Sequence, residues 1–271
     1  MSIIDTNLNF ADDTKDYWNN FWDNNNGYGS SNIDPDTNNK KLQKYHQILW
    51  SKQLPNGEYM DLQPSQDSYG TNILLWKDFV LSSDSLINGF RWPTMKSLID
   101  ELKVELPNYQ QFQEEYIRKA YTVGGMIVFP RHRNSINQRR GCSPFIKDRV
   151  DLTIECIRLY YEGKENPLSY VLKSDEKFFN LFNDFKGYIN YFYLQDIVSE
   201  DYKKVNIYIG SGNLKDSPLP QNTKEWFIWH DKTIDFLKKK KCTDSTSNVI
   251  IYIGIVFLMR FDINKFCHDS L

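Results

Sequence analysis

The stretch from Gly124 to Tyr161, GGMIVFPRHRNSINQRRGCSPFIKDRVDLTIECIRLYY, carries most of the signals that decide the fold of this chain. Its short apolar run over 126–129 predicts a buried strand, which Pro130 closes. A loop is expected over 135–143. Residues 144–162 then place apolar side chains at helical spacing, which predicts an amphipathic helix. A strand, a basic loop and a helix in succession indicate a mixed fold.

Working outward, the chain alternates short strands and helices. Residues 41–90 tend towards period two, and Asn56-Gly57 predicts the turn of a hairpin between two short strands. Residues 174–198 are apolar almost all round, which predicts a long central helix. The expected class is therefore α+β, with a helical core packed against short, mainly antiparallel strands. The remaining expected elements are helices over 95–103, 108–122 and 225–241 and a strand over 203–210.

The ends of the chain differ in composition from its middle. Residues 1–38 join an aromatic segment, 16–23, to an Asn/Gly/Ser-rich stretch, and this pattern predicts a flexible N-terminal arm. Residues 39–271 are expected to form a single α+β domain. The apolar run 249–259 is shorter than the roughly 20 residues that a helix needs to cross a bilayer. It is expected to be a strand, and no membrane contact is predicted.

Composition limits the classes of function. The 271 residues are 40% hydrophobic and 15% aromatic, which suffices for a packed core. The net charge of −2 gives no global reason to bind nucleic acid, so such binding requires a local patch. Four scattered cysteines without metal-type spacing, and no secretory signal, predict a reduced cytoplasmic protein. Nucleotide-binding, hydrolase and zinc-protease motifs are absent from the sequence.

Several phrases of the sequence resemble a family of uncharacterised bacterial proteins that carries a domain-of-unknown-function label. The resemblance covers roughly residues 41–200 and implies no particular reaction or cofactor. The phrases that carry it are HQILWSKQLPNG (46–57), LSSDS (81–85), INQRRG (136–141), DRVDLTIECIR (148–158) and YFYLQD (191–196).

The basic loop is the first candidate site. Guanidinium groups suit phosphate oxygens, and amide side chains suit bases or sugar hydroxyls. The alternative is a solvated loop whose arginines pair with acids of the same chain. The expected ligand-binding residues are Arg131, Arg133, Asn137, Gln138, Arg139, Arg140 and Arg149.

A row of acids on the predicted helix 144–162 is the second candidate site. Asp148, Asp151 and Glu155 are spaced so that their carboxylates share one helix face. Such a row can hold Mg²⁺ or Mn²⁺ for hydrolysis of a phosphodiester, or can pair with neighbouring arginines. His132 is a further catalytic candidate, because a histidine supports acid–base cleavage of RNA without metal.

A third candidate combines His46, Asp84 and Lys52. Here His46 would act as general base, Asp84 would orient it and Lys52 would serve as electrophile, provided the fold brings them together. The alternative for His46 is a hydrogen-bonded core residue.

Two functions follow as hypotheses, and the sequence leaves open whether the protein is an enzyme. The first is a protein that binds a phosphate-bearing ligand, RNA or DNA, through loop 131–149, as a nuclease-type toxin or phage-defence effector would. The second is a non-enzymatic interaction module that binds another protein through the aromatic N-terminal arm. In the second, the arginines and acids form an internal salt-bridge network.

Overall fold

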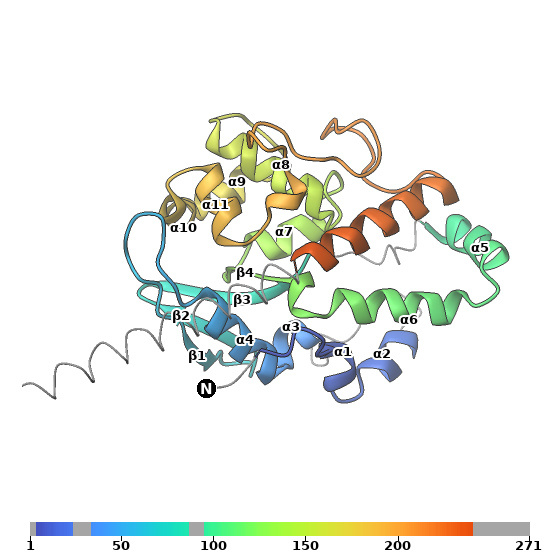
Figure 1. Cartoon of the computed structure of the whole chain (residues 1–271), viewed down its shortest axis with the longest axis horizontal. Helices are drawn as coiled ribbons and strands as arrows, with labels where there is room; N and C mark the ends of the chain where they lie inside the picture. The colour runs from blue at the N-terminus through green and yellow to red at the C-terminus, as the bar shows by residue number, and fades with distance from the viewer. Residues whose placement is uncertain (1–3, 24–33, 87–94, 241–271) are drawn as a thin grey trace, which may run out of the picture.

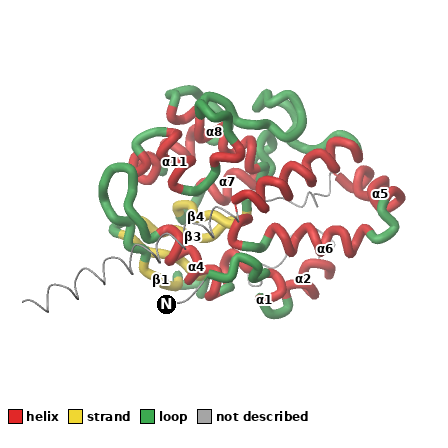
Figure 2. Tube along the Cα trace, viewed as in Figure 1, coloured by secondary structure: helices red, strands yellow, loops and turns green. Residues whose placement is uncertain are grey.

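The computed structural model describes residues 4–23, 34–86 and 95–240. It confirms the α+β class, because a four-stranded antiparallel sheet is embedded among helices (Figures 1 and 2). The strands lie in chain order. Their bounds are β1 (Gln63–Gln66), β2 (Asn72–Trp76), β3 (Phe79–Ser85) and β4 (Met126–Pro130).

Helices cover the sheet on two sides (Figure 1). The helices α3 (Pro35–Asn38) and α4 (Lys40–Trp50) contact β2 and β3. On the other side, α7 (Ile136–Cys142) contacts β4. The helix α8 (Val150–Tyr161) and the short helices that follow it lie on the same side of the sheet, beyond α7 (Figure 1). Asp84 of β3 is paired with Ile127 of β4. β4 ends at Pro130 and α7 begins at Ile136, so a short segment joins the sheet to α7.

A second group of helices extends from the sheet. It comprises α1 (Phe10–Asp13), α2 (Tyr17–Asp23), α5 (Lys96–Glu105), α6 (Tyr109–Ala120) and a helix over 223–240. Phe10 is fully buried, and its backbone N–H donates to the carbonyl of Tyr121, 2.8 Å away. The ring of Tyr17 packs edge-on against that of Tyr121. Residues 4–23 of the predicted arm are thus packed on the body, mainly against α6.

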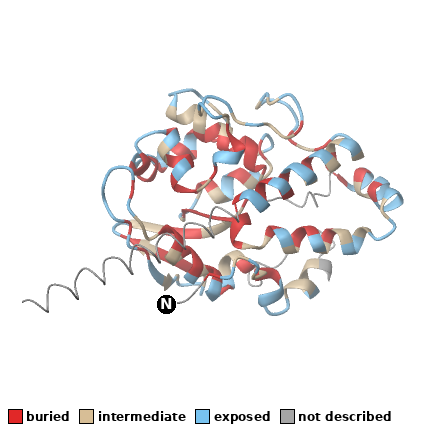
Figure 3. Cartoon of the chain, viewed as in Figure 1, coloured by how far each residue is buried: buried red, intermediate tan, exposed pale blue. Residues whose placement is uncertain are grey.

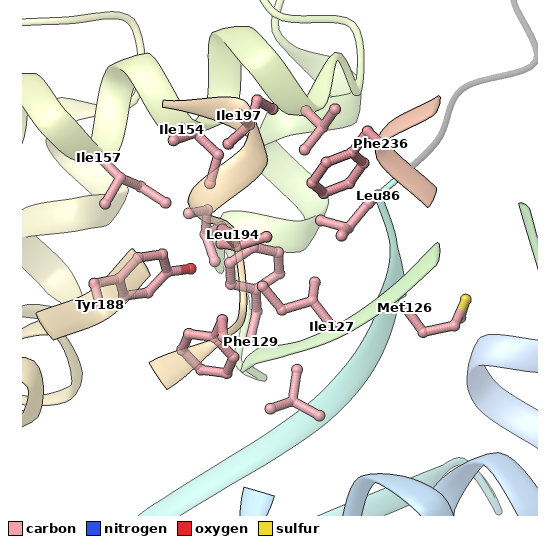
Figure 4. Close-up of a cluster of buried hydrophobic side chains, with 14 of the residues drawn as sticks. Leu86, Met126, Ile127, Phe129, Ile154, Ile157, Tyr188, Leu194, Ile197 and Phe236 are labelled. Atoms are coloured by element: carbon pink, nitrogen blue, oxygen red, sulfur yellow. The ribbon is translucent and has the colours of Figure 1, made fainter. Parts of the chain in front are cut away.

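The hydrophobic core lies where β4 meets the helices. Figure 3 shows buried residues concentrated on inward faces, and Figure 4 shows side chains of β4 meeting those of α8 and later segments. Ile127 and Phe129 of β4 and Ile154 and Ile157 of α8 are all fully buried. This contact confirms the buried strand and the apolar stripe that the sequence indicates.

Residues 40–50 form a helix, so the strand predicted there is wrong. Leu42, Tyr45, Leu49 and Trp50 are buried on one face of α4 at helical spacing, and this period outweighs the local alternation. Asn39 caps the helix, because its side chain accepts a bond from the N–H of Leu42. The hairpin turn does form: Gly57 has φ +89°, and Gln53 bridges Tyr59.

The boundary between loop and helix in the basic stretch also differs from expectation. Residues expected as a loop over 135–143 form most of α7, and the helix expected from 144 begins at Val150. Lys147 and Asp148 adopt left-handed backbone conformations, φ +48° and +58°, which no helix can include. These two residues therefore separate α7 from α8.

The predicted long helix over 174–198 is divided into short pieces. Asn183 has φ +65°, and Asp184 starts a new helix by accepting a bond from the N–H of Gly187 at 2.7 Å. The pieces still supply the expected apolar centre, since Phe178, Phe182 and Phe192 are buried. They are α9 (Ser169–Ser174), α10 (Glu176–Phe179), η3 (Asn180–Phe182), α11 (Phe185–Tyr191) and η4 (Gln195–Ile197).

The C-terminal elements are partly as predicted. The helix over 223–240 is present, whereas the strand expected over 203–210 is reduced to a single bridge between Val198 and Val205. The strand predicted over 249–259 lies outside the described residues. None of the described helices combines the length and apolar character that crossing a membrane requires.

Candidate functional site

The fold brings together residues from two predicted sites. Arg140 of α7 is fully buried, and its Nη1 donates to Asp84 Oδ2 of β3 at 2.9 Å. The same nitrogen lies 3.8 Å from Asp148 Oδ1, on the turn before α8. Arg140 also donates to the Ser85 carbonyl at 2.7 Å and to the Thr153 hydroxyl at 3.2 Å. This Arg140 cluster (Arg140, Asp84 and Asp148) therefore joins sheet, α7 and α8.

The backbone around Asp148 is shaped for this cluster. Its N–H donates to the Arg140 carbonyl at 3.1 Å, and its own carbonyl accepts from Arg140 Nη2 at 2.9 Å. A left-handed residue other than glycine costs about 1–2 kcal/mol, so these bonds offset a local strain. Gly141 supplies the needed space, because a Cβ atom there would lie 2.9 Å from Asp148 Oδ2.

The cluster holds more acid than base. Burial raises the pKa of the Asp84 carboxyl to about 7, against the opposing charge of Arg140 and with help from the charge of Asp148. Burial also raises the pKa of Asp36, near which the charges of Asp34 and Asp84 act in the same direction. Asp36 Oδ2 accepts from the N–H of Ser85 at 3.0 Å, which places a third carboxylate beside β3.

The second buried arginine holds a different acid. Arg149, 2% exposed, donates from Nε to Asp151 Oδ1 at 3.0 Å and from Nη2 to Asp151 Oδ2. Its remaining bonds go to the carbonyls of Ile209 and Pro218, both at 3.0 Å. Asp151 accepts a further bond from the N–H of Tyr208 at 2.9 Å. The pair therefore anchors the irregular segment 208–218 to the start of α8.

The predicted row of acids is divided among three arginines. Asp148 lies beside Arg140, Asp151 is bound by Arg149, and Glu155 is paired with Arg158 at 2.7 Å. Within the described ranges, no three or more His, Cys, Asp or Glu side chains converge as a metal site would require. The arrangement that would have held Mg²⁺ or Mn²⁺ is not formed by these acids.

His132 is held by two hydrogen-bond acceptors. Its Nε2 lies 2.7 Å from Asp175 Oδ1, and its Nδ1 lies 2.9 Å from the carbonyl of Arg133. The carbonyl of Arg133 can only accept, so Nδ1 carries a proton, and the Asp175 carboxylate favours a second proton on Nε2, which gives the imidazolium form. Burial works to lower the pKa of His132, but the bonds to Asp175 and the carbonyl raise it overall. Both nitrogens are engaged in these bonds, which disfavours a role as general base.

This geometry predicts a pH-dependent contribution to stability. Since the folded pKa of His132 lies above its ordinary value, its contribution is complete below about pH 6.5 and is lost as the pH rises through the folded pKa. The side chain is 41% exposed, so the effect should stay below about 1 kcal/mol. Urea unfolding of wild-type protein and His132→Gln at about pH 5.5 and pH 8.5 should show the variant destabilised only at the lower pH. Equal destabilisation at both pH values would exclude the imidazolium.

His46 and Asp84 lie on different sides of β3. His46 Nδ1 accepts from the indole N–H of Trp50 at 2.9 Å, so its Nε2 carries the proton and donates to Ser83 Oγ at 3.0 Å. Ser83 and Asp84 are consecutive strand residues and point to opposite faces, which keeps the predicted dyad apart. Burial lowers the pKa of His46 to about 3, so it stays neutral.

The ammonium group of Lys52 is bound by a backbone carbonyl and aromatic rings. Its Nζ donates to the carbonyl of Tyr191 at 2.7 Å and lies 3.8 Å from the centre of the Tyr193 ring. The rings of Trp50 and Tyr191 also lie within 5 Å of this nitrogen, at 4.9 and 4.5 Å. Lys52 is therefore a cation held by aromatic rings rather than an electrophile beside His46.

The rest of the basic loop divides into engaged and exposed side chains. Arg131 is paired with Asp67 at 2.7 Å, and Asn137 donates to the Ser82 hydroxyl at 2.9 Å. Arg133, Gln138 and Arg139 are exposed. Among the described residues, neither Arg133 nor Arg139 has a carboxylate partner, whereas every other described arginine has one.

Sequence reasoning missed the acids that complete these contacts. Asp67 and Asp175 lie 64 and 43 positions from Arg131 and His132, which they contact, so no local spacing pairs them. Asp36, which binds the N–H of Ser85 beside the Arg140 cluster, lies 104 positions from Arg140. The one available signal is Asp67, since an aspartate two residues before Tyr69-Gly70 is typical of a turn.

Comparison with known proteins identifies the family. A family model of unknown function, DUF6994, matches residues 4–242. The chain belongs to this family. The match confirms the expected domain of unknown function and extends beyond the stretch 41–200. No curated protein and no solved structure matches the DUF6994 chain.

Proposed function

We propose that this DUF6994 protein binds a phosphate-bearing ligand, a strand of RNA or DNA, through two exposed arginines: Arg133, in the turn before α7, and Arg139, on α7. The observation that carries the proposal is that Arg133 and Arg139 have no carboxylate partner among the described residues, although the chain matches its other described arginines with acids. Guanidinium groups that face solvent in this way suit phosphate oxygens. Arg140 and Arg149, expected as ligand-binding residues, are buried and serve the fold instead.

The turn is held in place by its own hydrogen bonds. Asn134, φ +69°, donates its N–H to Gln138 Oε1 at 3.1 Å, and its side-chain oxygen accepts from Arg139. The N–H of Ser135 donates to the carbonyl of His132 at 3.1 Å. A preformed turn loses less conformational entropy on binding, which favours recognition by the two arginines.

The geometry favours binding over cleavage. Nuclease-type hydrolysis as a toxin or defence activity would need acids free to hold a metal ion or a base free to accept a proton. Asp151 and Glu155 are bound by arginines, and Asp148 lies 3.8 Å from Arg140. Both ring nitrogens of His132 are engaged in hydrogen bonds. We therefore assign these four residues a structural role rather than a catalytic one.

The second candidate is a non-enzymatic protein-interaction module. The same pairing of acids with arginines favours it, because an internal salt-bridge network is what that hypothesis expects. The aromatic segment 16–23 supports it less, since Tyr17, Trp18 and Phe21 pack on the body of the protein. A surface that binds another protein would have to be formed by other residues.

Binding of a labelled single strand tests the first candidate. The double variant Arg133→Ala/Arg139→Ala is expected to bind a fluorescent oligonucleotide at least about 10-fold more weakly than wild type, with unchanged thermal stability. Arg158→Ala serves as the matched control, because it removes an arginine paired with Glu155 and Glu162 on α8. Fluorescence anisotropy gives both affinities. Equal affinities of the double variant and wild type would favour the interaction module.

A further inference from the structure

Tyr69 lies at the tip of the turn between β1 and β2. Its side chain is 90% exposed, the highest value among the large hydrophobic side chains in the described ranges. A tyrosine ring that faces water over nearly its whole surface adds nothing to a core. Single exposed apolar residues are common, so the significance of Tyr69 depends on its position.

The turn that carries Tyr69 is tightly built. Asp67 Oδ1 accepts from the N–H groups of Tyr69 and Thr71, both at 2.9 Å. The N–H of Gly70 donates to the Asp67 carbonyl at 3.0 Å, and φ +78° at Gly70 suits glycine. The backbone under the ring is therefore fixed, which lowers the entropy cost of a contact made by the ring.

The same carboxylate links this turn to the basic loop. Asp67 Oδ2 accepts from Arg131 Nη2 at 2.7 Å, while Oδ1 holds the turn. The N–H of Arg131 donates to the Val80 carbonyl at 2.7 Å, so this link is fixed to the sheet. Arg133 follows Arg131 by two residues. The Asp67 carboxylate thus links the turn that carries Tyr69 to the start of the segment that carries Arg133 and Arg139, the arginines without a carboxylate partner among the described residues.

We infer that Tyr69 is a stacking platform for a nucleobase and that the ligand is a single strand. This inference rests on the proposed function and narrows its ligand class. Single-strand-binding proteins combine cationic side chains for the backbone with aromatic rings on which bases stack. A duplex hides the faces of its bases, and inorganic polyphosphate has none. A platform of this kind raises affinity for single strands alone.

The test compares Tyr69→Ala with wild type on three probes: a fluorescent single strand of about 12 nucleotides, its duplex and a labelled polyphosphate. Loss of one stacked base should weaken binding of the single strand roughly 5- to 100-fold and leave the other probes unaffected. Tyr69→Trp should retain affinity, since indole also stacks. Tyr59→Ala is the matched control, because Tyr59 is a second exposed tyrosine, at 60%. This variant should bind like wild type.

The outcomes separate this inference from the proposed function. Unchanged single-strand affinity in Tyr69→Ala would overturn the stacking platform while leaving phosphate binding by Arg133 and Arg139 intact. Equal weakening on all three probes would also overturn it, because the ring would then act without bases. Failure of wild-type protein to bind any of the probes would overturn the proposed function itself.

Discussion

Replacing Arg140 with methionine is expected to destabilise the protein by about 3–5 kcal/mol, the range found when one partner of a buried ion pair is removed. The loss leaves Asp84 without its guanidinium partner at 2.9 Å and frees the carbonyls of Ser85 and Asp148. Methionine keeps much of the side-chain volume, so the measured effect reports mainly the lost charge and hydrogen bonds. Urea unfolding followed by circular dichroism measures it.

Arg139→Met is the matched control. Its guanidinium is exposed and bonds only to Asn134 among the described residues, so the expected change is within about 0.5 kcal/mol. If the two variants had equal stability, Arg140 would not be the internal partner that the structure indicates.

Asp151→Asn is expected to cost a similar amount, about 3–5 kcal/mol. The substitution leaves the buried Arg149 without a counter-charge and places an amide N–H₂ against a guanidinium or the Tyr208 N–H. Asp151 is fully buried, so water cannot compensate. The segment 208–218 should also become more susceptible to proteolysis, because this pair anchors it to α8.

Glu155→Gln provides the comparison for Asp151→Asn. Glu155 is paired with Arg158 on the outer part of the same helix, and such a pair contributes about 1 kcal/mol or less. Thermal unfolding of both variants separates the two cases. A loss below 1 kcal/mol in Asp151→Asn would mean that the buried pair does not hold the segment.

The parts of the fold set by local pattern were predictable from the sequence. The apolar run 126–129, the helical spacing of Ile154 and Ile157, and the turn at Asn56-Gly57 each depend on neighbours in the chain, and all three are found. Residues 174–198 show the limit of this reasoning. Their composition indicates burial correctly, but the left-handed residue Asn183 ends one helix and Asp184 begins the next.

The roles of the charged residues were not predictable in the same way. Arg139 and Arg140 are adjacent and chemically identical, yet one is exposed and the other is fully buried. The difference depends on Asp84, which lies 56 residues from Arg140 in the chain and reaches it only because β3 pairs with β4 beneath α7. Sequence spacing grouped Asp148 with Asp151, whereas the left-handed turn at Asp148 directs it towards Arg140.

The buried arginines of this protein serve the fold, and we propose that its exposed pair, Arg133 and Arg139, binds phosphate groups. The salt dependence of single-strand binding tests this proposal most directly. Each phosphate contact contributes about 0.7 to the slope of log affinity against log salt concentration. Arg133→Ala/Arg139→Ala is expected to lower the magnitude of this slope by about 1.4. An unchanged slope, with wild-type and variant proteins binding alike at every salt concentration, would contradict it.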